Sequence, residues 1–171
     1  RSAVAGPGEW IVGGMAKGAG MLAPALATML VVVTTDAVVA PDVLDRALRT
    51  ATSKTFDRAD SDGCMSTNDT VIVMASGASG IEPSESEFTA ALTGCCDSLA
   101  RQLIADAEGS AHDVAINVSG ALTEEDALEV ARSVARSNLF KCAIFGNDPN
   151  WGRVLASAGT SHATFDPEQV S

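Results

Sequence analysis

The length and charge of the chain limit its size and its partners. It has 171 residues, of which 46% are hydrophobic, which is enough to bury one sizeable core or part of a larger one. The formal net charge of −11 argues against binding to nucleic acid or to an anionic membrane surface, since both reward clustered lysine and arginine. We expect a small molecule or another protein as the partner.

The first predicted element lies in an apolar run, LAPALATMLVVVTTDA at residues 22–37. We expect a strand from Thr28 onward, because valines and leucine follow it and a polar Thr-Thr-Asp sequence ends the run. The most apolar part, residues 21–33, contains Pro24 and is shorter than the roughly 20 residues that span a bilayer. No transmembrane segment is therefore predicted.

Two helices and a strand follow. Residues 41–57 place their apolar side chains on one helical face, and Pro41 is tolerated in a first turn. The sequence TVIVMA at 70–75 predicts a buried strand. Residues 84–107 have apolar side chains at helical spacing and form the longest predicted helix.

The last third of the chain continues the alternation. HDVAINVSG at 112–120 alternates apolar and polar residues, as a half-buried strand does. Thr123 and the acidic residues after it predict the start of a helix that runs to about residue 138. KCAIFG, at 141–146, is predicted to return as a strand. The expected fold class is an α/β domain of layered sheet and helices, although the glycine-rich turn of a dinucleotide-binding unit is missing.

Three glycine-punctuated stretches have competing interpretations. GGMAKGAGMLAP at 13–24 is either a weak phosphate cradle or a flexible turn with Lys17 in solvent, and its Lys-Gly order does not match the Walker pattern. DSDGCMSTNDT at 60–70 lacks the glutamate of a calcium loop, so its polar side chains are expected to bond to backbone in a turn. FGNDPNWGRVLA at 145–156 is either a ligand loop or a connector with a tryptophan anchor, with Asp148 or Asn150 capping a helix that starts near Trp151.

The cysteines and histidines do not predict a metal site. The four cysteines have no metal-like spacing, and the two histidines are remote in sequence. We expect the cysteines to be small core residues in a reducing cytoplasm. The residues in question are Cys64, Cys95, Cys96, Cys142, His112 and His162.

Three motifs together resemble one known family. KGAGMLAPALATMLVVVTTDA, DGCMSTNDTV and GNDPNWGRVLA are similar to signatures of the ornithine acetyltransferases, also called glutamate N-acetyltransferases, of bacterial arginine biosynthesis. The resemblance covers the chain from about Trp10 to Gly159, and the motifs occur in the expected order. It implies the layered α/β fold of that self-processing family, here as a partial chain.

The resemblance also implies a self-cleavage site. Family members cut themselves at an Ala-Thr bond, which corresponds here to Ala27–Thr28. Residues 1–27 would then be the end of an α chain, and residues 28–171 would be the N-terminal part of a β chain, forming one α/β domain. A threonine suits this chemistry because its hydroxyl can attack its own peptide carbonyl, and the amine that is released can then act as general base.

The expected reaction is a ping-pong transfer. Thr28 would take the acetyl group of N-acetyl-ornithine as an ester and pass it to glutamate. By resemblance, Lys17 would bind a substrate carboxylate, and Glu108 would bind the cationic end of ornithine. No cofactor or metal is implied, although acetyl-CoA is a substrate of bifunctional members. The family's α and β chains associate, commonly as an α2β2 heterotetramer, and we expect this enzyme in the cytoplasm.

Part of the family's apparatus is absent from the sequence. The Thr-Gly pair of its oxyanion hole lies upstream of the cleaved bond, and further substrate-binding Asn and Thr residues lie near its C-terminus. The chain is therefore interpreted as part of a longer protein. We expect the STNDT and GNDPNWGR loops to lie near the active region. Two alternatives remain: a related self-processing amidohydrolase or aminopeptidase, and a non-catalytic chain in which Thr28 is merely packed.

Overall fold

The chain divides into two compact units. The computed structural model describes residues 2–5, 9–18, 29–60, 63–64, 68–166, 168 and 170. Residues 1–108 form the first unit and residues 109–171 the second. The predicted boundary between the α and β chains, Ala27–Thr28, lies outside the described residues and stays a prediction.

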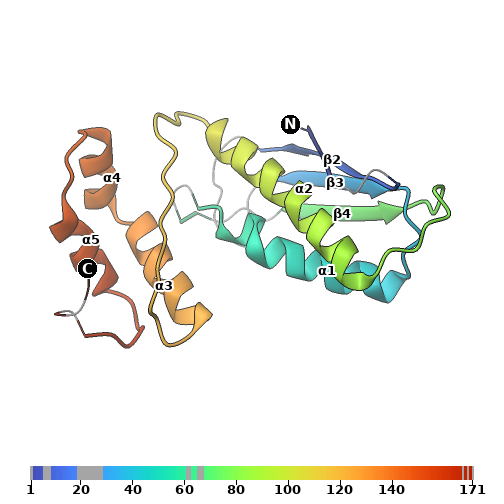
Figure 1. Ribbon diagram of the computed structural model, residues 1–171. Helices are drawn as coiled ribbons and strands as arrows, with labels where there is room; N and C mark the ends of the chain where they lie inside the picture. Colours follow the sequence, from blue (N-terminus) through green and yellow to red (C-terminus); the bar gives the residue numbers. More distant parts are fainter. Residues whose placement is uncertain are drawn as a thin grey trace. The chain divides into compact units, whose positions relative to one another are not determined.

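A four-stranded mixed sheet is the framework of the first unit. Its strands lie in the order β1 (Ser2–Ala5), β2 (Val12–Lys17), β3 (Leu30–Thr35) and β4 (Thr70–Ala75). β2 is antiparallel to both β1 and β3, whereas β3 and β4 are parallel and are joined through a helix (Figure 1). The predicted strands at 70–75 and in the valine run are confirmed, the latter from residue 30. The prediction that the strand at 70–75 is buried is wrong, because every residue of β4 is exposed or half-buried.

Two helices cover one face of this sheet and enclose the core. α1 (Pro41–Lys54) is followed by a short 3-10 turn, η1 (Phe56–Arg58), and α2 (Glu85–Ala105) packs beside α1 and across β2 (Figure 1). Both helices occur where the periodicity predicts them, and Pro41 occupies the first turn of α1. The largest fully buried side chains alternate along the strands and recur along α2: Val12, Val31, Val33, Phe88, Leu92, Cys95, Cys96 and Leu99. The predicted α/β layered fold class is confirmed.

The opposite face of the sheet is apolar and exposed among the described residues. Met15 is 66% exposed and Met74 is 51% exposed, and the side chains that share their face are similarly open: Leu30, Val32 and Ile72. Side chains alternate between the two faces of a strand, so these exposed residues alternate along their strands with the buried residues that face the helices.

Gly14 lies in β2 with neighbours packed closely around it. A Cβ at this position would lie 3.1 Å from the Leu99 side chain of α2, from the Val32 carbonyl oxygen and from the Val33 side chain. Glycine therefore lets α2 approach β2 more closely than a residue with a Cβ would allow without a shift of its neighbours. The interpretation of residues 13–17 as a turn is wrong, because they belong to β2.

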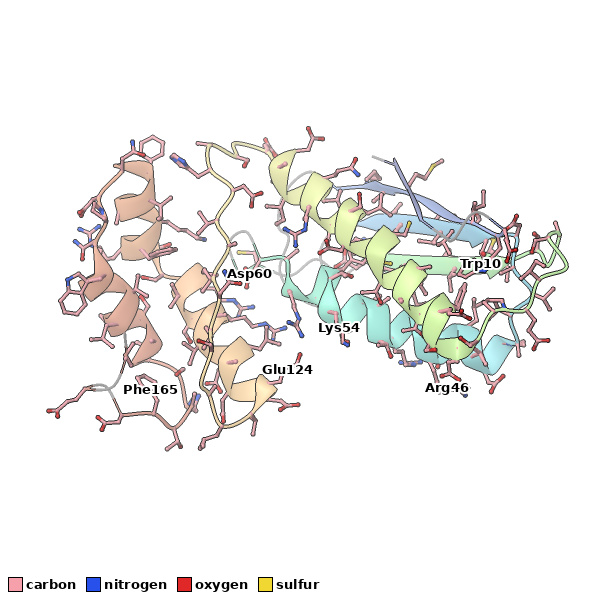
Figure 2. The ribbon with its side chains drawn as sticks, in the orientation of Figure 1. Trp10, Arg46, Lys54, Asp60, Glu124 and Phe165 are labelled. Carbon is pink, nitrogen blue, oxygen red and sulfur yellow. The ribbon has the colours of Figure 1, made fainter. Side chains whose placement is uncertain are left out.

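The first turn of α2 is fixed by a capping box and also carries an exposed ion pair with α1. The Ser84 hydroxyl accepts the Glu87 N–H, and the Glu87 side chain accepts the Ser84 N–H at 3.0 Å. This pairing holds the pKa of the Glu87 carboxyl below its ordinary value, mainly through the Ser84 hydroxyl. Figure 2 shows Arg46 beside this turn, where its guanidinium donates to both oxygens of Glu85. These charges are exposed, so the ion pair adds little stability.

The cap yields a first prediction. Ser84→Ala should lower the free energy of unfolding by about 1 kcal/mol, because an N-terminal amide of α2 loses its acceptor. The rate of hydrogen exchange at the first-turn amides of α2 should rise as the stability falls. Ser84→Asp keeps an acceptor and is the matched control. Equal exchange in the native protein and Ser84→Ala would contradict the assigned role of the hydroxyl.

The described part of the second unit contains three short helices. α3 (Glu124–Ala135) and α4 (Asn138–Phe145) both pack on α5 (Trp151–Ala158). The predicted caps are confirmed: the Thr123 hydroxyl accepts the Asp126 N–H at 3.0 Å, and the Asn150 side chain accepts the Arg153 N–H at 3.2 Å.

Two predicted strands of the second unit are wrong. Residues 112–120 belong to no strand of the described sheet, although their polarity alternates. Alternating polarity indicates which side chains would share a face of a strand, but it does not show whether a neighbouring strand is available to pair with it. Residues 141–146 fall within α4 and its C-cap, because the Ser137 side chain accepts the Phe140 N–H and starts a new helix. Among the described residues, no helix combines the length and apolar character needed to cross a membrane.

Candidate functional site

Three strand ends meet in register at one end of the sheet. β2 ends at Lys17, which pairs with Leu30, the first residue of β3. Leu30 also pairs with Thr70, the first residue of β4. Lys17 and Thr70 therefore flank the start of β3 on its two sides. We call this part of the molecule the β3 start.

Met29 is held at the β3 start through both of its backbone groups. Its N–H donates to Asp69 Oδ1 at 2.8 Å, and its carbonyl oxygen accepts the Thr70 N–H at 2.9 Å. Its side chain is partly buried against the hydrophobic core. The backbone directly after residue 28 is thus fixed by hydrogen bonds to residues 69 and 70.

Asp69 is the residue of this site that sequence reasoning missed. The STNDT side chains were expected to bond within their own turn, but Asp69 accepts from a backbone group 40 residues away in sequence. Partial burial raises the pKa of the Asp69 carboxyl above its ordinary value, and the Met29 N–H acts in the opposite direction. The only signal in the sequence is a carboxylate directly before a predicted strand.

Lys17 and Glu108 lie at the same end of the first unit. Lys17 is exposed on the sheet face that the helices leave open. α2 runs back along the sheet and ends at the end of the sheet where β3 begins (Figure 1). Glu108 is exposed and follows α2 closely, while Ala107 still packs against the core. The fold therefore brings these two sequence-predicted residues to the end of the sheet where β3 begins.

Ala27 and Thr28 lie outside the described residues. Their position along the chain nevertheless relates them to the site, since Met29 is bonded directly to Thr28. The nucleophile and cleavage assignments stay predictions, as do the binding roles of Lys17 and Glu108.

The other end of β3 has a similar carboxylate contact. Asp36 Oδ1 accepts the Ile11 N–H at 2.8 Å, directly after the strand. The Thr35 hydroxyl donates to the Ile11 carbonyl at 2.7 Å. Trp10 lies at this end of the sheet and Asp60 at the end where β3 starts (Figure 2). Asp36 thus makes the same kind of bond as Asp69, one strand length from the candidate site.

The described residues contain no group of three or more histidine, cysteine or carboxylate side chains that could hold a metal ion. Asp60 Oδ1 accepts the Gly63 N–H at 2.9 Å, as in a turn. Cys95 and Cys96 are buried in α2, and burial raises the pKa of the Cys96 thiol to about 12. Cys64 and Cys142 are exposed, so the prediction that all four cysteines are core residues is wrong for these two.

The GNDPNWGR loop belongs to the second unit. Asn147 has a positive φ of 52°, and the Asp148 N–H donates to the Ala143 carbonyl at 2.8 Å, which reverses the chain after α4. The Arg153 guanidinium donates to the Leu139 carbonyl at 2.8 Å. Trp151 is 75% exposed and does not anchor the connector, contrary to that interpretation. A place for this loop near the active region stays a prediction.

Comparison with known proteins identifies the family. The model of the ArgJ family matches residues 1–171. The chain belongs to the ArgJ family. This confirms the resemblance found in the three sequence motifs.

Curated ArgJ relatives match at high identity. The arginine biosynthesis bifunctional protein ArgJ of Streptomyces avermitilis is 64% identical over 162 residues, which are 95% of this chain and 42% of that protein. ArgJ 1 of Streptomyces clavuligerus is 60% identical over 171 residues, which are 100% of this chain and 45% of that protein. The chain thus spans less than half the length of these relatives.

A solved ArgJ structure supports the fold. The crystal structure of the arginine biosynthesis bifunctional protein of Bacillus halodurans has a TM-score of 0.75 and 39% sequence identity. The match covers 79% of this chain and 66% of that chain. The mixed sheet with its helices is accordingly an ArgJ fold.

Proposed function

We propose that the protein containing this chain transfers the acetyl group of N2-acetyl-L-ornithine to L-glutamate in arginine biosynthesis. Its nucleophile is Thr28, freed by self-cleavage of the Ala27–Thr28 bond. ArgJ membership and the relatives' names as arginine biosynthesis proteins support this function. The observation that supports it most is structural: Met29, the residue after Thr28, is held at the end of the sheet where Lys17 lies and where α2 also ends.

Self-cleavage needs only the threonine and water. The Thr28 hydroxyl adds to the Ala27 carbonyl carbon, the C–N bond breaks, and the acyl group moves from nitrogen to oxygen. Water then hydrolyses this ester and leaves a carboxylate on Ala27 and an amine on Thr28. The amine and hydroxyl now belong to one residue, so the amine can accept the hydroxyl proton.

Acetyl transfer repeats this chemistry on the substrate. The Thr28 hydroxyl attacks the acetyl carbonyl of N-acetyl-ornithine, and its proton passes through the threonine amine to the departing ornithine nitrogen. The acetyl ester is then attacked by the amine of glutamate. One amide is broken and one is formed, so the overall transfer requires no external energy source.

Lys17 and Glu108 have the charges that this substrate requires. N-acetyl-ornithine carries an α-carboxylate and a side-chain ammonium group. We propose that Lys17 binds the carboxylate and that Glu108 binds the ammonium. Both side chains are exposed at the end of the sheet where β3 begins, and they come from different elements. Opposite charges that bind the two ends of the substrate would orient its acetyl group.

The whole protein assayed with N-acetyl-ornithine tests the function. Ornithine release should depend on glutamate and should match the N-acetylglutamate formed. Glutamate-independent release of acetate and ornithine would instead indicate an amidohydrolase. No reaction and an uncut chain would indicate a non-catalytic protein.

Binding by Lys17 yields a separate prediction. Lys17→Met should raise KM for N-acetyl-ornithine by about tenfold or more, since hydrogen bonds to charged groups contribute roughly 1.5–3 kcal/mol. Self-cleavage should continue, because that step involves no substrate carboxylate. Lys54→Met is the matched control, since Lys54 is also exposed and ends α1. An unchanged KM in Lys17→Met would remove Lys17 from the binding site.

The word bifunctional in the relatives' names suggests a second activity. We propose that this activity is the acetylation of glutamate by acetyl-CoA, with acetyl-CoA acting as a substrate and no resident cofactor. We further propose that the α and β chains assemble as an α2β2 heterotetramer in the cytoplasm. Replacing N-acetyl-ornithine by acetyl-CoA in the same assay tests the second activity.

A further inference from the structure

We propose that Asp69 is a positioning residue for Thr28: its carboxylate fixes the peptide unit that joins Thr28 to Met29. This inference rests on the proposed function, in which Thr28 is the nucleophile. It adds a residue from the STNDT loop to the site and gives that loop a physical role.

The contacts of Met29 carry the inference. Its N–H donates to Asp69 Oδ1 at 2.8 Å, its carbonyl accepts from the Thr70 N–H at 2.9 Å, and its side chain packs against the core. Two neighbouring residues of one segment thus hold both polar groups of Met29. The amide nitrogen bound by Asp69 is bonded directly to the carbonyl carbon of Thr28.

The position of Asp69 in the parallel ladder explains why a side chain is needed there. Leu30 and Thr70 are the first paired residues of β3 and β4. Regular pairing therefore does not extend to Met29 and supplies no backbone acceptor for its N–H. An amide at this depth needs an acceptor. The Asp69 carboxylate supplies one, and a bond to a charged acceptor is stronger than the backbone bond it replaces.

Fixing this peptide unit matters because the reaction depends on where the hydroxyl is held. A nucleophile must lie within a near-attack distance of the carbonyl carbon, and a misplacement of about 1 Å can cost 100-fold in rate. The Asp69 bond restrains the backbone next to Thr28 and uses neither its hydroxyl nor its amine. Asp69 therefore acts through Thr28 and does not transfer a proton itself.

Three variants of the whole protein test the proposal. Asp69→Ala removes the acceptor. Asp69→Asn keeps a side chain of the same length with an oxygen that can still accept the Met29 N–H. Asp36→Ala is the matched control, since Asp36 Oδ1 also accepts a backbone N–H at 2.8 Å, at the other end of β3. For each variant, the rate of Ala27–Thr28 cleavage is followed by intact mass, and kcat and KM for N-acetyl-ornithine are measured on the cleaved enzyme.

We expect Asp69→Ala to slow cleavage and to lower kcat by about tenfold to 100-fold, with KM nearly unchanged. Asp69→Asn should recover most of both rates, and Asp36→Ala should keep both near native. Native rates in Asp69→Ala would overturn the proposal. So would an Asp69→Asn variant as slow as Asp69→Ala, or an Asp36→Ala variant with the same loss of kcat.

The same measurements separate this inference from the function on which it rests. If the native whole protein neither cleaves itself nor transfers acetyl groups, the proposed function fails. If the native protein does both and Asp69→Ala equals it, only the positioning role of Asp69 fails.

Discussion

Replacing Thr28 by alanine should leave the Ala27–Thr28 bond intact and abolish acetyl transfer. In the proposed mechanism the same hydroxyl attacks twice, first its own peptide bond and then the acetyl carbonyl. Alanine has no oxygen for either step, and an uncut chain has no amine at residue 28 to act as base. Loss of a catalytic nucleophile costs on the order of a million-fold in kcat, so activity should fall below detection.

Intact mass and the glutamate-dependent assay measure the two losses. Thr28→Ser keeps a hydroxyl and should still be cut and active. Thr34→Ala is the matched control on β3, because its exposed hydroxyl donates only a long bond of 3.4 Å to the Gly13 carbonyl. Cleavage or transfer by Thr28→Ala would disprove the nucleophile assignment.

Replacing Phe88 by alanine should destabilise the first unit by about 3–5 kcal/mol, as large-to-small core substitutions of phenylalanine do. Phe88 is fully buried, and its ring centre lies 6.0 Å from that of Trp10. Alanine would leave a cavity between α2 and the sheet and would remove the ring contact. The loss is large relative to a net folding stability of about 5–15 kcal/mol.

Native-state hydrogen exchange measures this loss within the whole protein. Amides of α2 and β2 should exchange faster in Phe88→Ala by the corresponding free energy. Phe145→Ala is the control, because Phe145 is 74% exposed at the end of α4 and a surface change costs within about 0.5 kcal/mol. Unchanged protection of α2 in Phe88→Ala would contradict the assignment of Phe88 to the core.

Local patterns predict most helices of the fold but only part of the sheet. The buried side of α2 is visible in its spacing, and TVIVMA coincides with β4. β2 is not predicted because glycines lower strand propensity, and the reason for Gly14 is its contact with Leu99, 85 residues away. The break between α3 and α4 depends on a single serine cap at residue 137, which the apolar pattern of 141–146 obscures.

The candidate site, like the fold, is only partly predictable from the sequence. The motif resemblance selects Lys17, Thr28 and Glu108, whereas the structure adds Asp69. A sequence shows that Asp69 precedes a strand, but not which backbone N–H lies opposite its carboxylate. That contact arises from the parallel pairing of β3 with β4, which joins segments 40 residues apart. Long-range backbone contacts of this kind carry no local signature.

The length of α2 sets the distance between Ser84, which caps its start, and Glu108, which follows its end. Its 21 residues span about 30 Å at 1.5 Å per residue, and its buried face extends from Phe88 to Leu103. One inserted residue within this stretch would rotate everything after it by about 100° and turn later core side chains toward solvent. Insertions and deletions during evolution should therefore collect in the loop at 76–84. α2 should keep a constant length, and Glu108 should keep a constant distance from Ser84, which caps α2.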